Sequence, residues 1–120
     1  MSEGKTPVDA EAKPIELSES RMEKIHVDSL QLLDKIFFYT AKSTYTLTVG
    51  KDLHCLLSST NPESKVGLII LRGGTNEDVT EYTPNRIFVG GRLAYAFDQD
   101  DTALVTTSVI ESIAYKPCPK

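Results

Sequence analysis

The clearest pattern of apolar and polar positions in the chain lies between Ile36 and Val49. Most residues of this stretch are β-branched or aromatic, the types that pack well on a pleated surface. Its second half alternates strictly, so that Tyr45, Leu47 and Val49 share one face and three threonines share the other. The pattern predicts a β-hairpin that nucleates a small barrel or sandwich.

The register of this hairpin depends on the number of loop residues around 41–43. An even number places Ile36 and Phe38 on the face of Tyr45. An odd number places Phe37 and Tyr39 there instead. The first strand is apolar on both faces, which predicts a central strand that is covered on both sides. The turn contains no glycine or asparagine, so a two-residue type I′ turn is not expected.

Further apolar runs predict additional strands separated by turn residues. Val66–Leu71 is a nearly unbroken apolar run, which is typical of a buried strand, and Gly67 within it indicates a bulge or a close backbone approach. A bend at Gly90 and Gly91 divides the later apolar run at residues 87–97. The second part of this run, residues 92–97, predicts another hairpin with residues 103–108. Ile110 and Ile113 lie three residues apart, which predicts a 3₁₀ turn before a short closing strand.

These elements predict a mainly β fold: a single small antiparallel β-barrel, SH3-like or similar, of about 5–7 strands. Residues 1–23 are predicted to form a disordered acidic leader, because they are rich in charged residues, serine and proline. The barrel domain is expected to span residues 24–116, followed by a flexible tail at 117–120. Residues 25–35 fit either a short helical turn or a first strand followed by a turn.

The net charge of −4 over 120 residues is unevenly distributed. The leader carries −3 (three basic and six acidic residues), residues 24–116 carry −2 (nine basic and eleven acidic) and Lys120 adds +1. A domain that binds nucleic acid by bulk charge has a clear basic excess, so nucleic acid is not the favoured partner. No signal-like segment and no run of about 18 apolar residues is present, which predicts a cytoplasmic protein without a membrane partner.

The residue types of catalytic and metal sites occur without a recognisable motif. Cys55 and Cys118 fit no zinc or redox spacing and are expected to be free thiols in a reducing compartment. His26 and His54 are the only histidines, and His54 is expected on the strand face opposite Cys55. We therefore predict no catalytic residue, no metal site and no cofactor, and a hydrolase or metal enzyme centred on His54 is the least favoured alternative.

Two short motifs have a functional alternative to an ordinary turn. Asp98, Asp100 and Asp101 offer clustered oxygens for calcium, but the glycine and distal glutamate of an EF-hand are missing, so a solvated turn is favoured. Residues 73–75 could present amide groups to an anion, but no helix or lysine follows them. A turn is favoured there as well.

Residues 73–85 form the longest interruption of the apolar pattern, and loops of this length are often functional or mobile. Arg72, Arg86 and Arg92 lie close to this segment in the sequence, and Tyr82 lies within it. If the strands that carry them are adjacent, these four residues would form a basic and aromatic binding rim. The favoured alternative is that the arginines face solvent and pair with the acidic residues of the loop.

Three short motifs resemble a group of uncharacterised bacterial small β-barrel domains that carry a T-x-x-S-x-Y-x-L hairpin. They are Thr40-x-x-Ser43-x-Tyr45-x-Leu47, Gly91-Arg92-Leu93 and Thr107-Ser108 followed by Ile113. The resemblance covers about residues 29–115, and Val109 stands where that group has a proline. It implies a fold and no known activity.

The preferred function is that of a non-enzymatic binding or scaffolding module with an unknown protein partner, which would contact an edge strand or the 73–85 loop. The alternative is a regulatory domain that binds single-stranded RNA through Arg72, Tyr82, Arg86 and Arg92. A homo-oligomer is a further alternative, because an incompletely closed sheet can pair across a two-fold axis.

Overall fold

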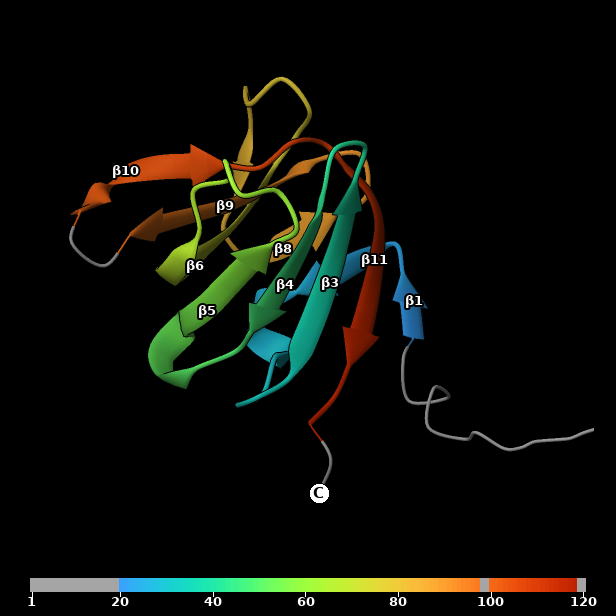
Figure 1. Ribbon diagram of the computed structural model, residues 1–120, viewed down its shortest axis with the longest axis vertical. Helices are drawn as coiled ribbons and strands as arrows, with labels where there is room; N and C mark the ends of the chain where they lie inside the picture. The colour runs from blue at the N-terminus through green and yellow to red at the C-terminus, as the bar shows by residue number, and fades with distance from the viewer. Residues whose placement is uncertain (1–19, 98–99, 119–120) are drawn as a thin grey trace, which may run out of the picture.

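The computed structural model describes residues 20–97 and 100–118 (Figure 1). In chain order the strands within these ranges are β1 (Ser20–Met22), β2 (Lys24–His26), β3 (Lys35–Thr40), β4 (Thr44–Thr48), β5 (His54–Ser59), β6 (Gly67–Thr75), β7 (Tyr82–Thr83), β8 (Arg86–Phe88), β9 (Arg92–Phe97), β10 (Asp100–Thr106) and β11 (Ile110–Lys116). Two 3₁₀ segments, η2 (Val27–Ser29) and η3 (Lys51–Leu53), accompany them. Across the described ranges no helix is long and apolar enough to cross a membrane.

Nine strands belong to one antiparallel sheet, in the order β1-β11-β3-β4-β5-β6-β9-β10 with β7 paired to β6. The other two, β2 and β8, form a separate antiparallel ribbon. Within the described residues the end strands β1 and β10 do not pair with each other, so hydrogen bonding does not close the sheet. The mainly β class is confirmed, whereas closure into an SH3-like barrel is not.

The β3–β4 hairpin has the even-numbered loop that places Ile36 and Phe38 with Tyr45 and Leu47. Phe38 pairs with Tyr45 and Ile36 pairs with Leu47, and all four side chains are buried. Loop residues 41 and 42 do not have positive φ, so the turn is not of type I′. The alternating pattern predicts the shared face of the β4 side chains, and the length of the loop decides which face of β3 joins it.

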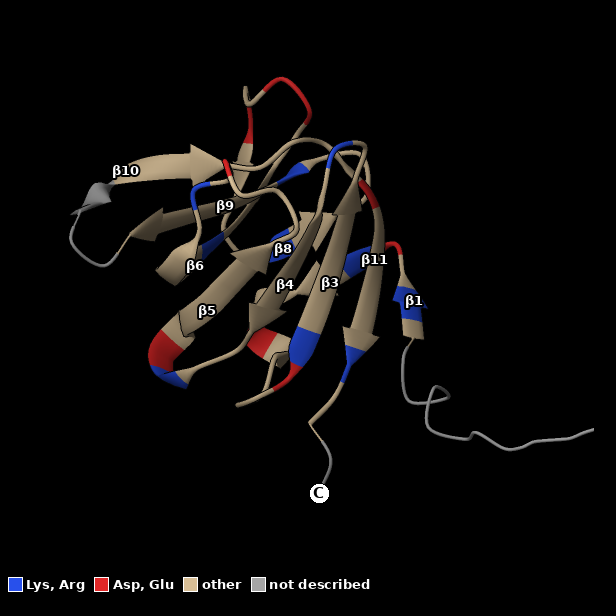
Figure 2. Ribbon diagram, in the orientation of Figure 1, with Lys and Arg blue, Asp and Glu red and all other residues tan. Residues whose placement is uncertain are grey.

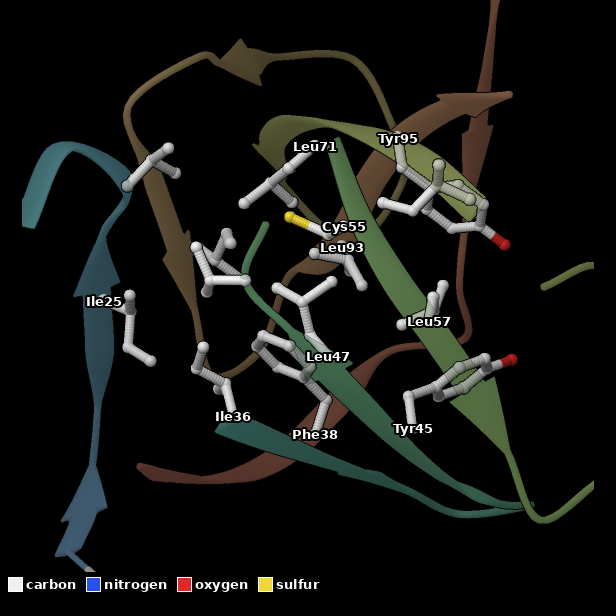
Figure 3. Packing of buried hydrophobic residues seen from close by; sticks show 14 of the residues in the cluster. Ile25, Ile36, Phe38, Tyr45, Leu47, Cys55, Leu57, Leu71, Leu93 and Tyr95 are labelled. Atoms are coloured by element: carbon white, nitrogen blue, oxygen red, sulfur yellow. The ribbon is translucent and has the colours of Figure 1, made fainter. Parts of the chain in front are cut away.

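The hydrophobic core lies on the concave side of this sheet. Side chains from β3, β4, β5, β6 and β9 point into one interior, with Ile25 of the β2–β8 ribbon at its side (Figure 3). Phe38, Leu47, Leu57 and Leu93 are at most 1% exposed. One face of a single curled sheet thus supplies most of the core, and the ribbon covers the part that the sheet leaves open.

The β2–β8 ribbon approaches β6 at two glycines that the sequence pattern assigns to a loop. Gly73 and Gly74 belong to β6 and pair with β9, and Gly74 also pairs with β7. A Cβ atom on Gly73 would lie 2.3 Å from the Thr83 carbonyl oxygen, and one on Gly74 would lie 2.6 Å from that of Arg86. Because no side chain separates the backbones, the segment leading into β8 crosses β6 in direct contact.

A bulge near the start of β11 replaces the 3₁₀ turn that the spacing of Ile110 and Ile113 predicts. Ile110 pairs with Thr40, but Ser112 pairs with Tyr39, so Glu111 is the extra residue. An extra residue reverses the side-chain alternation beyond it, and both isoleucines therefore face the core and are fully buried. A bulge, rather than a helical turn, therefore places Ile110 and Ile113 on the same side of the chain.

The outer face of the sheet remains exposed where the sequence predicts burial. Leu68 of β6 is 71% exposed and its cross-strand neighbour Leu56 of β5 is 50% exposed. Phe37 and Tyr39 on β3 are half-buried, so β3 is central in its pairing but is not covered on both sides. An unbroken apolar run here marks a strand with one buried face.

The first described strand begins before residue 24, and the last one ends at Lys116. Strand β1 pairs with β11 through residues that the sequence analysis assigns to the leader, and residues 1–19 lie outside the described part. Both alternatives for residues 25–35 hold in part, because β2 is followed directly by the 3₁₀ turn η2. The expected bend at Gly90 and Gly91 is present between β8 and β9.

Gly67 and Gly73 provide a matched test of the glycine crossing. Their φ angles are +134° and +136°, but a Cβ on Gly67 would meet no atom within 4 Å. We expect Gly67→Ala to lower the free energy of unfolding by about 1–2 kcal/mol through backbone strain alone. Gly73→Ala should lower the free energy of unfolding by about 3–4 kcal/mol, because the new Cβ atom would also overlap with the backbone of residues 83–84. Urea denaturation measures both values, and equal losses would contradict the direct contact.

Candidate functional site

The four predicted rim residues lie on neighbouring elements. Arg92 begins β9 and pairs with Thr75 of β6, Arg72 lies three residues before Thr75, and the Arg86 backbone contacts Gly74. The condition set by the sequence analysis, that adjacent strands carry the arginines, is therefore met by the backbone. The side chains of the four residues nevertheless differ from one another in their contacts.

Arg92 and Tyr82 both make hydrogen bonds within the fold. The Arg92 guanidinium donates from Nε to the Glu77 carbonyl oxygen (2.6 Å) and from Nη1 to the Thr107 carbonyl oxygen (2.9 Å). The Tyr82 hydroxyl donates to the Arg72 carbonyl oxygen (2.6 Å). Arg92 thus connects the 76–81 loop to the segment before β11, and the contact with Glu77 is made to the backbone rather than to the carboxylate.

Arg86 is exposed on the outer side of the β2–β8 ribbon, directly opposite His26. His26 and Lys24 are also exposed on this side, because they flank buried Ile25 in an alternating strand. Figure 2 shows basic segments of β8 and of other strands as separate blue bands on the ribbon. The four rim residues are therefore close along the backbone, and a shared binding rim stays a prediction.

The loop between β6 and β7 is folded around the Asn76 side chain. Asn76 Oδ1 accepts hydrogen bonds from the amides of Thr80 and Glu81, both at 2.9 Å, and Nδ2 donates to Thr80 Oγ1 at 2.7 Å. The loop, at the top of Figure 1, is shorter than predicted because β6 continues to Thr75. Residues 73–75, for which an ordinary turn was favoured over an anion-binding site, belong to strand β6 instead.

The residues weighed for catalysis or metal binding do not come together. His54 is exposed and Cys55 is buried on the opposite face of β5, as the strand period predicts. Burial raises the pKa of the Cys55 thiol, and neither Cys55 nor Cys118 forms a disulfide within the described residues. No group of three or more His, Cys, Asp or Glu residues is placed to hold a metal within the described residues. Asp98 and the side chains of Asp100 and Asp101 lie outside that part.

No family model matches this chain, and no curated protein or solved structure matches it. The resemblance to bacterial small β-barrel domains therefore stays a prediction. Any functional proposal has to come from the surface of the molecule itself.

An apolar strip on the outer face is the surface feature that differs most from the sequence prediction. We define the outer strip as Leu56 of β5 with Leu68 and Ile70 of β6. Leu56 and Leu68 are direct cross-strand neighbours, and Ile70 follows Leu68 on the same face. Scattered exposed leucines are ordinary, but adjacent ones form a patch that water solvates poorly.

A buried carboxylate forms a polar cluster that sequence analysis missed. Asp34 is 2% exposed, and its side chain accepts hydrogen bonds from the Tyr115 hydroxyl (2.7 Å), the Gln31 amide (2.9 Å) and the Cys118 amide (3.0 Å). These contacts join the loop before β3 to the end of β11. No local pattern indicates the contacts with Tyr115 and Cys118, because these two residues are more than 80 positions away from Asp34.

The two arginines with contrasting surroundings allow a test of whether Arg92 is structural. Arg92→Ala should lower the free energy of unfolding by about 1.5–3 kcal/mol, because two backbone carbonyls lose a charged donor. Arg86→Ala should change it by no more than about 0.5 kcal/mol. Urea denaturation of both variants checks this, and equal stabilities would show that the Arg92 contacts contribute little.

The hydrogen bond to Asp34 raises the pKa of Tyr115 to about 12, and burial raises that of Tyr95 to about 12. An unfolded tyrosine ionises near pH 10. Between pH 10 and 12 the unfolded state therefore binds fewer protons than the folded state, and stability falls as pH rises. We expect Tyr115→Phe to show a shallower fall over this range in urea titrations, with the contribution of Tyr95 retained. A slope equal to that of the wild type would contradict the Asp34 contact.

Proposed function

We propose that this chain is a non-enzymatic protein-binding module and that its partner contacts the outer strip. The observation that carries the proposal is the exposure of Leu68 and Leu56, 71% and 50%, on adjacent strands. Burying a leucine side chain that was exposed is favourable by roughly 1.5–3 kcal/mol. A partner that covers both residues would therefore gain a substantial part of a specific interaction from this pair.

The position of the outer strip also favours a protein partner. The neighbouring strand β4 presents Thr44, Thr46 and Thr48 on the same face, all half-buried. An apolar centre surrounded by polar side chains is the composition of many protein–protein contacts. Strand β10, at the end of the sheet order, offers an unpaired edge that an extended segment could join.

The RNA-binding alternative has less support. Single-stranded RNA is bound by exposed aromatic rings and mobile basic side chains. Arg92 and Tyr82 are both engaged in hydrogen bonds to backbone carbonyls, which restrains the two side chains that would be needed. We therefore rank it below the protein-binding proposal.

Two finer proposals accompany this function. The first is that the curled sheet is an incompletely closed barrel, supported by the backbone hydrogen bonds from Gly90 to Ile110 (2.9 Å) and from Ile110 to Gly91 (2.8 Å). The second is a cytoplasmic location, supported by the buried thiol of Cys55, which forms no disulfide, as is typical of a reducing compartment.

The decisive variant is Leu56→Ser combined with Leu68→Ser. Surface changes of this kind should alter stability by no more than about 0.5 kcal/mol each, so the fold is retained. Immobilised wild-type protein is expected to capture a specific protein from a lysate of the source cells, and the double variant is expected to lose it.

Leu32→Ser provides the matched control, because Leu32 is 59% exposed but lies in the loop before β3. It should retain the captured protein. Capture that is the same for all three proteins would contradict the proposal. Self-association of the wild type that the double variant abolishes, measured by sedimentation, would instead identify the strip as a homo-oligomer contact.

A further inference from the structure

We propose that a cavity between the start of β3 and the end of β11 binds a small monocarboxylate with an apolar body, such as a short-chain fatty acid. The cavity has a volume of about 260 Å³ and is lined by Leu33, Lys35, Lys116, Pro117 and Cys118. It is remote in sequence from the outer strip. The inference is therefore independent of the proposed protein-binding function.

The first observation is a pair of like charges at this cavity. Lys35 and Lys116 are direct cross-strand partners in the β3–β11 ladder, and Figure 2 shows both as blue bands at the same end of the sheet. Like charges placed directly opposite each other destabilise a sheet. A carboxylate between the two ammonium groups would remove this repulsion and gain two charge-assisted hydrogen bonds.

The acidic residue that lies next to Lys35 in the sequence is already engaged in other hydrogen bonds. Asp34 is the acidic group adjacent to Lys35, and its carboxylate is buried and accepts hydrogen bonds from Tyr115, Gln31 and Cys118. The Lys35 ammonium donates to Thr48 Oγ1 at 3.3 Å, which is a neutral acceptor. Among the described residues that line the cavity, the charged side chains are those of Lys35 and Lys116, and both are basic.

The second observation is the apolar wall. Leu33 is 55% exposed and has a φ of +70°, a conformation that is uncommon for leucine and costs about 1–2 kcal/mol. Its amide donates to the Val49 carbonyl oxygen (2.8 Å), which holds the residue in this strained position at the cavity. Strained residues of this kind are concentrated at ligand-binding sites.

Size and rigidity determine the class of ligand. A cavity of about 150 Å³ can hold a benzene molecule, so about 260 Å³ accommodates a six-carbon chain with its carboxylate. The Asp34 hydrogen bonds to Tyr115 and to the Cys118 amide fix the far wall. The apolar wall would contact the chain, and the lysine pair would bind the carboxylate.

The test is an NMR titration of the full chain with hexanoate and, separately, with 1-hexanol. Hexanoate is expected to shift amide signals at residues 33–35, 116 and 118 in a saturable manner, whereas hexanol, which lacks the charge, should bind about tenfold more weakly. Shifts that do not saturate or that scatter over the surface would overturn the proposal. Equal binding of the alcohol would overturn it as well, because the lysine pair would then have no role.

A double variant, Lys35→Gln with Lys116→Gln, tests the lysine pair directly. It should weaken hexanoate binding about tenfold, as expected for the loss of two exposed ion pairs. The control is Lys42→Gln with Lys65→Gln, which makes the same change in net charge at two exposed lysines away from the cavity. The control should bind hexanoate like the wild type, and an equal loss in both double variants would overturn the proposal by showing a general charge effect.

Discussion

The direct backbone contact at Gly73 and Gly74 is the constraint on which the rest of the fold depends. A single curled sheet leaves one side of its interior uncovered, and the β2–β8 ribbon fills that side with Ile25 and Ile87. The ribbon can reach this position only because β6 has no side chains where the 83–87 segment crosses it. Backbone hydrogen bonds from Val27 to Asn85 and from Val89 to Glu23 continue the pairing of β2 with β8 at both ends of the ribbon.

The two faces of the sheet have different roles. The inner face is closely packed and includes Tyr45 and Tyr95, whose hydroxyls point away from the core (Figure 3). These hydroxyls contact Ser64 and the Lys65 carbonyl oxygen, so the polar atoms of both rings are satisfied at the turn after β5. The outer face has no such cover, and its apolar residues remain in contact with water. Both proposed binding surfaces therefore lie outside the packed core, where a ligand can be accommodated without repacking it.

Residue type and spacing in the sequence identify some of the residues at the candidate sites but not their contacts. The sequence brings Arg72, Arg86 and Arg92 to attention because they lie close together along the chain, and their backbones are indeed neighbours. What each guanidinium contacts depends on carbonyl groups of other segments, such as those of Glu77 and Thr107 for Arg92. Asp34 and the Lys35–Lys116 pair have no local signal at all, because each depends on the alignment of β3 with β11.

The sequence by itself determined the mainly β class, the shared face of Tyr45, Leu47 and Val49, and the opposite directions of His54 and Cys55, because strand side chains alternate with a period of two. The register of the β3–β4 hairpin was decided by the structure, because the sequence allows both an even and an odd number of loop residues. The sequence could not determine which apolar faces would be covered, so Leu68, which lies in a nearly unbroken apolar run, was expected to be buried. It also could not distinguish a bulge at Glu111 from a helical turn, since both place Ile110 and Ile113 on one side. These features were decided by tertiary structure, because burial, strand alignment and the glycine crossing each depend on a second segment that is distant in the chain.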